Sequence, residues 1–389
     1  MESRNKSTMP FRAAFLLWIA TSFLGAQPSA NYQVSWEHDF GRFSHHFFLQ
    51  CAGVDGQGDL WVLTSAFTDA HDYAFKQTLF RIDGPGTQKS AIEIEAPIPR
   101  DVSVDLAEYY PAILSDGPAG FLINVTRALG RDIESRGTFY ATMSKSGGVG
   151  RPVRISGTDG PISWRMVPLT DGDILALGDQ SPLVTQKISP TGDVRWRRRF
   201  WKYLDLPDAA AVGQGESCVV SSEYPRTPDT QELHLLRLNA DGMLQQQTRF
   251  HGHVAVVAPG PSGSCAVFYY DYLPRKMEEA RYHLTVFDAS FRQQWTKDIP
   301  TTIAGRSGMT WYLIALRDGY LAGGTAWNGD LFLARYSWSG ELRWIETRKL
   351  SYRLDSVVPT QDGFYLIGET EAPQGPPTSY RVTRVTVLR

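Results

Sequence analysis

The chain has 389 residues with 42% hydrophobic and 21% charged side chains, which is the balance of an ordinary folded protein. Its formal net charge is −2, and its one dense basic run, Arg195–Arg199, is interpreted as an exposed strand edge, so nucleic-acid binding is excluded. The 35 glycines, 23 prolines and 12% aromatic residues indicate many turns and half-buried strands rather than helices.

The first segment has the features of a secretory signal peptide. Its basic start consists of Arg4, Lys6 and Arg12. An uncharged apolar stretch, Ala13–Leu24, would make a helix of about 18 Å, too short for a hydrocarbon core of roughly 30 Å. Small residues follow, with cleavage points after Ala26 or Ala30. We expect a signal peptide at residues 1–26 and a secreted or periplasmic domain at residues 27–389, without a membrane span; an uncleaved anchor is the alternative.

A turn containing glycine precedes a hydrophobic strand seven times along the chain. The glycines of these turns are Gly58, Gly117, Gly172, Gly215, Gly263, Gly319 and Gly363. They recur on average every 51 residues or so, about the period of a β-propeller, whose repeats hold several short strands. In the clearest copy, Thr170–Phe200, the order is strand, loop, strand, turn, strand. The chain is therefore predicted to be an all-β, seven-bladed β-propeller with four-stranded blades.

A second marker follows the third strand of each repeat. There a residue that can cap a turn is followed three positions later by glycine or a substitute, as in a type I turn. The pairs are Asp83/Gly86, Ser144/Gly147, Ser189/Gly192, Asn239/Gly242, Asp288/Phe291 and Ser337/Gly340. Four residues later three repeats carry a tryptophan: Trp196, Trp295 and Trp344. We interpret these indoles as packing between blades rather than stacking on a ligand.

The two chain ends complement one another. The seventh repeat ends with the predicted strand Tyr380–Leu388 and has no fourth strand, while a spare strand, Tyr32–Phe40, lies at the start and carries Trp36 in the tryptophan position. We predict that this N-terminal strand completes the last blade and closes the ring. Closure leaves no open seam for other chains, so a monomer is expected.

The outer hairpins Ser189–Trp196 and Ser337–Trp344 fit the pattern Asp-x-x-Gly-x-x-x-Trp, with Ser in the first position. In this they resemble the quinoprotein-like (PQQ-like) propeller repeats of exported bacterial proteins, and the resemblance covers nearly the whole mature chain. It implies a propeller with tryptophans between blades. The dehydrogenases of that family have eight blades and a calcium and quinone site. The seven repeats counted here depart from that pattern, so we predict no cofactor, and a quinone or metal site is the weakest alternative.

The cysteines give no disulfide framework. The chain has three, Cys51, Cys218 and Cys265, and the last two fall at matching positions in neighbouring repeats. Packed sheets lie about 10 Å apart, whereas the Cα atoms of a disulfide lie within roughly 7 Å. We expect buried free thiols.

Binding residues are expected on one face of the ring. In each blade the two short turns share one face, and the longer connections between second and third strands and between blades share the other, which we call the long-loop face. Binding side chains concentrate on such variable loops and on the entries of the inner strands. The candidate site residues are Tyr110, Trp164, Arg165, His253, Tyr270, Tyr272, Arg275, Trp311, Arg353 and Asp355. Because aromatic and arginine side chains anchor protein interfaces and aromatic faces stack on sugars, a protein or polysaccharide partner is expected. The alternative is that these tyrosines only cover the loops.

Neither a catalytic nor a metal signature stands out. His251 and His253 lie two residues apart and could share a metal, but no nearby cysteine or carboxylate in the sequence completes a ligand set, so no metal site is predicted. We interpret the chain as an exported, non-catalytic binding or interaction module. The alternative is a carbohydrate- or polymer-active enzyme with its site at the channel mouth. It would need two carboxylates about 5–10 Å apart, and Asp355 is the only obvious one on an inner strand.

Overall fold

The chain is almost entirely β-structure. A computed structural model describes residues 31–41, 47–67, 75–94, 106–114, 117–126, 137–144, 148–155, 163–178, 183–200, 204–223, 232–273, 276–299, 311–325, 330–370 and 379–388. The predicted signal peptide lies outside these ranges. Within them the only helical segment is the short 3-10 turn η3 (Pro261–Gly263).

The strands form seven sheets of four antiparallel strands each. The first strands of blades one to seven are β2 (Phe47–Val54), β6 (Leu106–Leu114), β10 (Ser163–Pro168), β14 (Leu204–Ala211), β18 (His253–Pro259), β22 (Trp311–Leu316) and β26 (Arg353–Pro359). The second strands are β3 (Leu60–Phe67), β7 (Gly117–Thr126), β11 (Ile174–Gly178), β15 (Ser217–Glu223), β19 (Cys265–Leu273), β23 (Gly319–Thr325) and β27 (Gly363–Glu369). The third strands are β4 (Phe75–Ile82), β8 (Gly137–Thr142), β12 (Val184–Ile188), β16 (Glu232–Leu238), β20 (Lys276–Phe287), β24 (Asp330–Ser337) and β28 (Tyr380–Val387). The outer strands are β5 (Gln88–Ile94), β9 (Val153–Arg154), β13 (Val194–Arg199), β17 (Leu244–His251), β21 (Gln293–Ile299), β25 (Leu342–Lys349) and, from the other chain end, β1 (Tyr32–Phe40).

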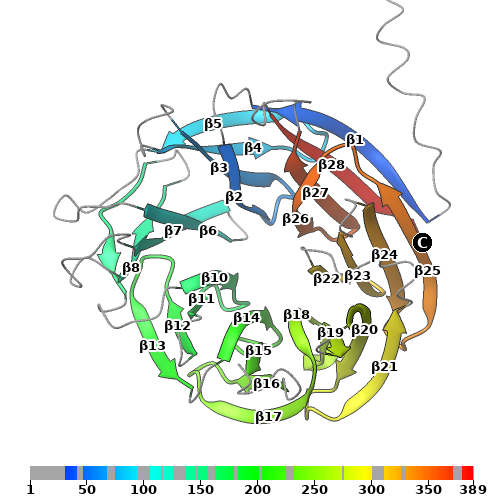
Figure 1. Ribbon diagram of the computed structural model, residues 1–389. Helices are drawn as coiled ribbons and strands as arrows, with labels where there is room; N and C mark the ends of the chain where they lie inside the picture. Colours follow the sequence, from blue (N-terminus) through cyan, green and yellow to red (C-terminus); the bar gives the residue numbers. More distant parts are fainter. Residues whose placement is uncertain are drawn as a thin grey trace, which may run out of the picture.

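The blades form a ring around a central channel, with each first strand innermost (Figure 1). The predicted seven-bladed propeller is thereby confirmed. So is its closure, because β1 pairs antiparallel with β28 from Tyr32 opposite Val387 to Phe40 opposite Tyr380. The Arg381 guanidinium adds an ion pair to Asp39, with Nε 2.6 Å from Oδ1. Each chain end therefore holds the other in blade seven.

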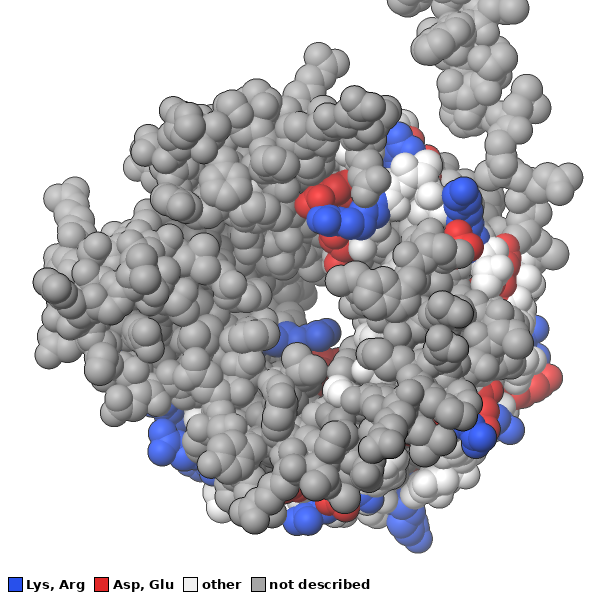
Figure 2. All heavy atoms as spheres, in the orientation of Figure 1, with Lys and Arg blue, Asp and Glu red and all other residues white. Residues whose placement is uncertain are grey.

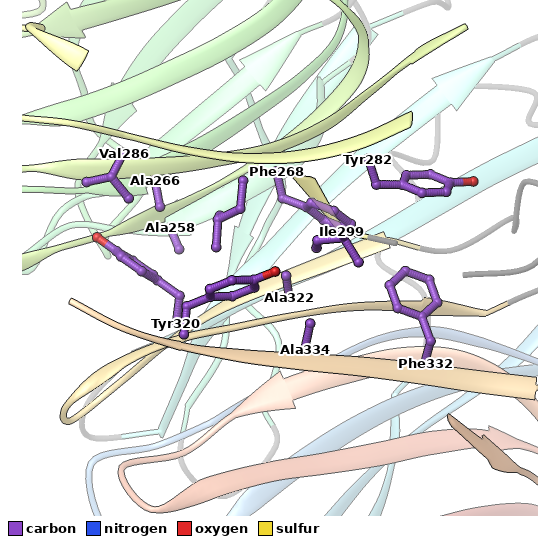
Figure 3. Close-up of a cluster of buried hydrophobic side chains, with 12 residues drawn as sticks. Ala258, Ala266, Phe268, Tyr282, Val286, Ile299, Tyr320, Ala322, Phe332 and Ala334 are labelled. Carbon is purple, nitrogen blue, oxygen red and sulfur yellow. The ribbon is translucent and has the colours of Figure 1, made fainter. Parts of the chain in front are cut away.

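Hydrophobic side chains fill every junction between neighbouring blades. Seven clusters of buried residues lie one at each junction, the last of them joining blade seven to blade one through Tyr365, Tyr380 and Phe80. Figure 3 shows the junction of blades five and six, with Val286 and Tyr320 toward one end and Tyr282 and Phe332 toward the other. Middle strands such as β11, β23 and β27 are buried on both faces, so their sequences read as continuous apolar runs rather than as alternating apolar and polar residues. The core is thus a closed series of interfaces.

The outer-strand tryptophans link neighbouring blades, as predicted. Each indole N–H donates to the carbonyl of the second residue of the next blade's outer turn. The pairs are Trp36 to Gly84 (2.8 Å), Trp196 to Ala240 (2.8 Å) and Trp295 to Trp338 (3.0 Å). Trp344 differs because blade seven has chain ends in place of that turn, and its ring packs near Tyr32, with centroids 6.1 Å apart. Between blades two and three, Tyr140 replaces the tryptophan and donates to Pro190 O at 3.2 Å.

The tryptophan explains why the turn ends in glycine. Gly242 has φ +73°, and a Cβ there would lie 2.6 Å from the Trp196 ring. In blade five the same turn position is Phe291, which adopts φ 56° and is buried in the junction with blade four. The residue that would cover it from blade four is Gln246 rather than tryptophan. A side chain is therefore tolerated only where no indole occupies the space.

A basic residue near the end of most third strands was not predicted. It lies two positions before the outer turn, or at the corresponding place in β28, and binds a carboxylate on the inner turn of its own blade. The pairs are Arg81–Asp59, Lys187–Asp171, Arg237–Glu216, Arg335–Asp318 and Arg384–Asp362. Arg237 and Arg335 also donate to carbonyls of the next blade, at Ala289 and Leu388. Lys187 likewise donates to Ala240 O of blade four, so three of these basic residues tie their blade to the next one on the short-turn face.

Two cysteines meet at the junction of blades four and five. Cys218 and Cys265 are free thiols and fully buried, as predicted, whereas the side chain of the third cysteine, Cys51 in β2, is not among those described. The neighbouring Cys265 thiol and burial raise the pKa of Cys218 well above its usual value. Such thiols are poor nucleophiles, so this pair serves packing.

Candidate functional site

Five of the seven inner strands enter the ring from the long-loop face through a β-bulge or another register shift. In β10 the residue between Ser163 and Arg165 has no ladder partner, and in β26 the same is true of Asp355. Similar register shifts occur at the entries of β2, β14 and β18. A bulge turns its extra residue out of the regular alternation. Two predicted site residues, Trp164 and Asp355, occupy these bulges.

An aromatic cluster crosses the junction of blades five and six on the long-loop face. The ring of His253, at the start of β18, stacks on Tyr270 of β19 with centroids 5.2 Å apart and planes at 11°. Tyr270 in turn lies 5.6 Å from Trp311, the first residue of β22. All three of these rings are partly exposed. The buried ring of Tyr282 packs against Trp311, with the two centroids 4.8 Å apart. Burial raises the pKa of the Tyr282 hydroxyl to about 12. The strand ends thus present a continuous aromatic surface.

An arginine holds two carboxylates in blade seven. Arg353 Nε lies 3.3 Å from Asp355 Oδ1, and its Nη2 lies 2.5 Å from Glu369 Oε2. Burial raises the pKa of Asp355, although Arg353 opposes that shift. Glu369 is 5% exposed, so a ligand in the channel would meet Arg353 and Asp355 first.

A buried aspartate joins three blades around the channel. Asp208 of β14 is 2% exposed; its Oδ1 lies 2.9 Å from Arg165 Nε of blade three, and its Oδ2 accepts from the Val257 N–H of blade five at 2.9 Å. Burial raises the pKa of Asp208 despite these donors. Because its oxygens face protein partners, we assign it a structural role. Figure 2 shows basic and acidic side chains beside the central opening.

The predicted site residues whose side chains are described therefore fall into three groups. His253, Tyr270 and Trp311 come together in the aromatic cluster; Arg353 and Asp355 pair in blade seven; and Arg165 binds Asp208. The remaining four lack described side chains or lie outside the described residues. Tyr110, Trp164 and Tyr272 belong to β6, β10 and β19, and Arg275 falls outside.

Sequence reasoning missed several residues of these groups. Asp208, Glu369 and Tyr282 became visible only once the register was known, because each lies in a strand whose apolar pattern gives no sign of its partner. His251 and His253, considered as a metal pair, belong to different blades. A different set, Glu223, Glu232 and His234, brings potential metal ligands together in blade four.

The opposite face carries single exposed apolar side chains. The exposed large hydrophobics of the described residues are Val153, Val194, Met243, Leu342 and Leu388. They lie at the starts of outer strands or, for Leu388, at the chain end beside such a strand, one to a blade. Scattered single residues of this kind are ordinary surface. They nevertheless provide a control surface for binding experiments.

Comparison with known proteins defines the fold and no more. No family model and no curated protein matches the sequence. Among solved structures, the Pyrococcus horikoshii acylaminoacyl peptidase matches with a TM-score of 0.52 and 12% identity, over 88% of this chain and 52% of that one. The chain therefore spans about half the length of that peptidase.

Two further structures match over almost their whole length. BBS1N, in its complex with ARL6DN, has a TM-score of 0.51 and 10% identity over 92% of this chain and 97% of its own. The Neurospora crassa Pan2 WD40 domain has a TM-score of 0.51 and 10% identity over 92% and 96%. At such identities the likeness shows the fold alone. Within the described residues no helix has the length and apolar character to cross a membrane.

Proposed function

We propose that the chain is an exported, non-catalytic binding module whose ligand surface is the long-loop face. The observation that carries this is the aromatic cluster of His253, Tyr270 and Trp311, three partly exposed rings in contact across a blade junction. Rigid aromatic side chains lose little conformational entropy on binding and are enriched among interface hot spots. Protein or polysaccharide surfaces fit this chemistry, since both offer apolar faces with hydrogen-bonding groups at their edges.

The charges at the channel support binding rather than hydrolysis. The inner-strand carboxylates Asp208 and Asp355, and Glu369 behind them, each lie within 3.3 Å of an arginine nitrogen. A general acid works best when its pKa lies near the working pH and its proton can reach the substrate. Asp355 has a raised pKa, as a general acid needs, but Arg353 lies between it and Glu369 and binds both carboxylates. A polymer-active enzyme with Asp355 as its acid is the alternative function.

Export is part of the proposal. Both cleavage points, after Ala26 and after Ala30, precede β1, which begins at Tyr32, so cleavage at either one leaves the closing strand complete. The N-terminal residue of the protein isolated from its own host, determined by mass spectrometry, tests this. At the level of the fold, BBS1N is a similar structure in complex with another protein, ARL6DN.

Tyr270→Ala should weaken partner binding by at least about tenfold, because removing a hot-spot side chain typically costs 2 kcal/mol or more. The experiment captures binders from the host's secreted proteins and soluble polysaccharides on immobilised residues 27–389. It then measures the affinity of the recovered partner by surface plasmon resonance. The folded state of the variant is checked by circular dichroism.

The matched control is a double substitution on the opposite face, Met243→Ser with Leu342→Ser, which should leave that affinity unchanged. Binding lost in the control and kept in Tyr270→Ala would place the surface on the short-turn face and contradict the proposal. Release of reducing ends from a polysaccharide, abolished by Asp355→Asn, would establish the enzyme instead.

A further inference from the structure

Blade four gathers three metal-ligand side chains at the long-loop end of β15 and β16. One oxygen each of Glu223 and Glu232 and one ring nitrogen of His234 lie within 4.8 Å of one another. His234 is only 3% exposed, and its Nε2 is 2.8 Å from Glu223 Oε2. Glu232 and His234 are two residues apart on β16, so both side chains project from the same face of the blade. The ladder fixes this arrangement.

The charges of this cluster favour a cation. Glu223 and Glu232 bring two carboxylates to one place, and like charges at this distance repel unless something neutralises them. The nearest described cation is Arg249, whose Nη1 is 3.9 Å from Glu232 Oε2, longer than a hydrogen bond. With a neutral imidazole the group keeps a net negative charge. Glu232 forms an ion pair with Arg249, and a bound divalent cation would lie between the oxygens of both carboxylates and the imidazole nitrogen.

The imidazole is held by a second polar side chain. Nδ1 of His234 lies 3.0 Å from the amide of Gln247, on the neighbouring strand β17. Rotating that amide by 180° makes its oxygen the acceptor of an Nδ1–H, which frees the Nε2 lone pair toward the carboxylates. Metal-bound histidines almost always have such an outer hydrogen bond, since it fixes the ring and the tautomer.

We propose that Glu223, Glu232 and His234 bind a divalent transition ion of the zinc class. Imidazole and carboxylate ligands suit Zn²⁺, and three protein ligands leave its fourth position open. His251 lies directly opposite Glu232 in the β16–β17 ladder but is not one of the three ligands that come together. By coordinating residues of both strands, the bound ion would hold the ends of β15 and β16 together on the proposed binding face.

Blade five provides an internal comparison. His283 occupies the position of His234, five residues before the outer turn, and is also largely buried. There both ring nitrogens face a carboxylate, with Nδ1 2.9 Å from Asp298 and Nε2 3.3 Å from Asp271. These carboxylates lie at opposite nitrogens of the ring, so they do not converge on one ligand atom. His283 is therefore the matched control.

The test is calorimetric titration of residues 27–389 with ZnCl₂ after treatment with a chelator. We expect saturable binding of one ion per chain, weakened at least about tenfold in Glu223→Gln with Glu232→Gln and unchanged in His283→Gln. Glutamine keeps the shape of glutamate, and the side chain of Glu232 is 48% exposed, so Glu232→Gln alone serves if the double variant is unstable. Titration with Co²⁺ gives a second readout, because its visible absorption reports nitrogen and oxygen ligation.

Loss of the Co²⁺ bands in His234→Ala, with the fold intact by circular dichroism, would support the assignment. Absence of saturable Zn²⁺ binding to the unsubstituted chain would overturn it. So would equal affinity in the unsubstituted chain and the Glu232→Gln variant.

Discussion

Removal of residues 27–40 should prevent the chain from forming a stable ring. Without β1, strand β28 becomes an exposed edge, and the aromatic side chains of Tyr380 and Tyr365 lose their cover from Phe40 and Trp36. An open sheet edge also recruits other chains. We therefore expect residues 41–389 to aggregate or to lose cooperative thermal unfolding, as measured by circular dichroism and size-exclusion chromatography.

The magnitude follows from what β1 contributes. Tyr32 and Phe40 are both buried, and each buried aromatic side chain is worth about 1.5–3 kcal/mol. The ladder adds several hydrogen bonds worth about 0.5–1.5 kcal/mol each. Together these approach the stability of a typical domain, about 5–15 kcal/mol. Removing only residues 27–30, which precede the strand, is the control. Unchanged stability of the chain that begins at residue 41 would show that the ring does not depend on its N-terminal strand.

Trp295→Ala should lower the free energy of unfolding by roughly 3 kcal/mol. The indole packs against Tyr320 and Tyr336 of blade six and donates to Trp338 O, so its loss opens a cavity and leaves that carbonyl without its donor. The measurement is the denaturation midpoint in urea, followed by fluorescence and by circular dichroism.

Ser90→Ala is the matched control for Trp295→Ala, because Ser90 holds the same outer-strand position in blade one, four residues after Gly86. A change of less than about 0.5 kcal/mol is expected there, as for most surface substitutions. Equal effects of the two substitutions would mean that the tryptophans do not join the blades.

The repeat period and the chain ends made the fold predictable. Glycine turns and outer-turn pairs recur because each blade has the same strands and the same packing against its neighbours. The strand left over at Tyr32–Phe40 supplies the fourth strand that blade seven lacks after Tyr380–Val387. The tryptophans were predictable for the same reason, since their neighbours across the junction are set by the repeat.

The candidate site was predictable only in part. His253, Tyr270 and Trp311 were chosen as strand-entry or loop residues, and the structure brings them together. Arg165 and Arg353 were chosen as inner-strand entry residues without their partners, and each binds a carboxylate within or beside its own blade. Those partners, Asp208 and Glu369, depend on cross-strand register and on bulges, which shift side chains by one position without a trace in the local pattern.

The closure of the ring by β1 and β28 can be tested most directly with a paired cysteine substitution, Gln33→Cys with Thr386→Cys. These residues are direct partners in the ladder, and opposed Cα atoms in antiparallel strands lie about 4.5–5.5 Å apart, within the range of a disulfide. Mild oxidation should give an internal cross-link that joins the two chain ends, seen as a mass two hydrogens lower and as faster migration on a non-reducing denaturing gel. Full alkylation of both introduced thiols in the native state, at the rate found in each single variant, would contradict the closure.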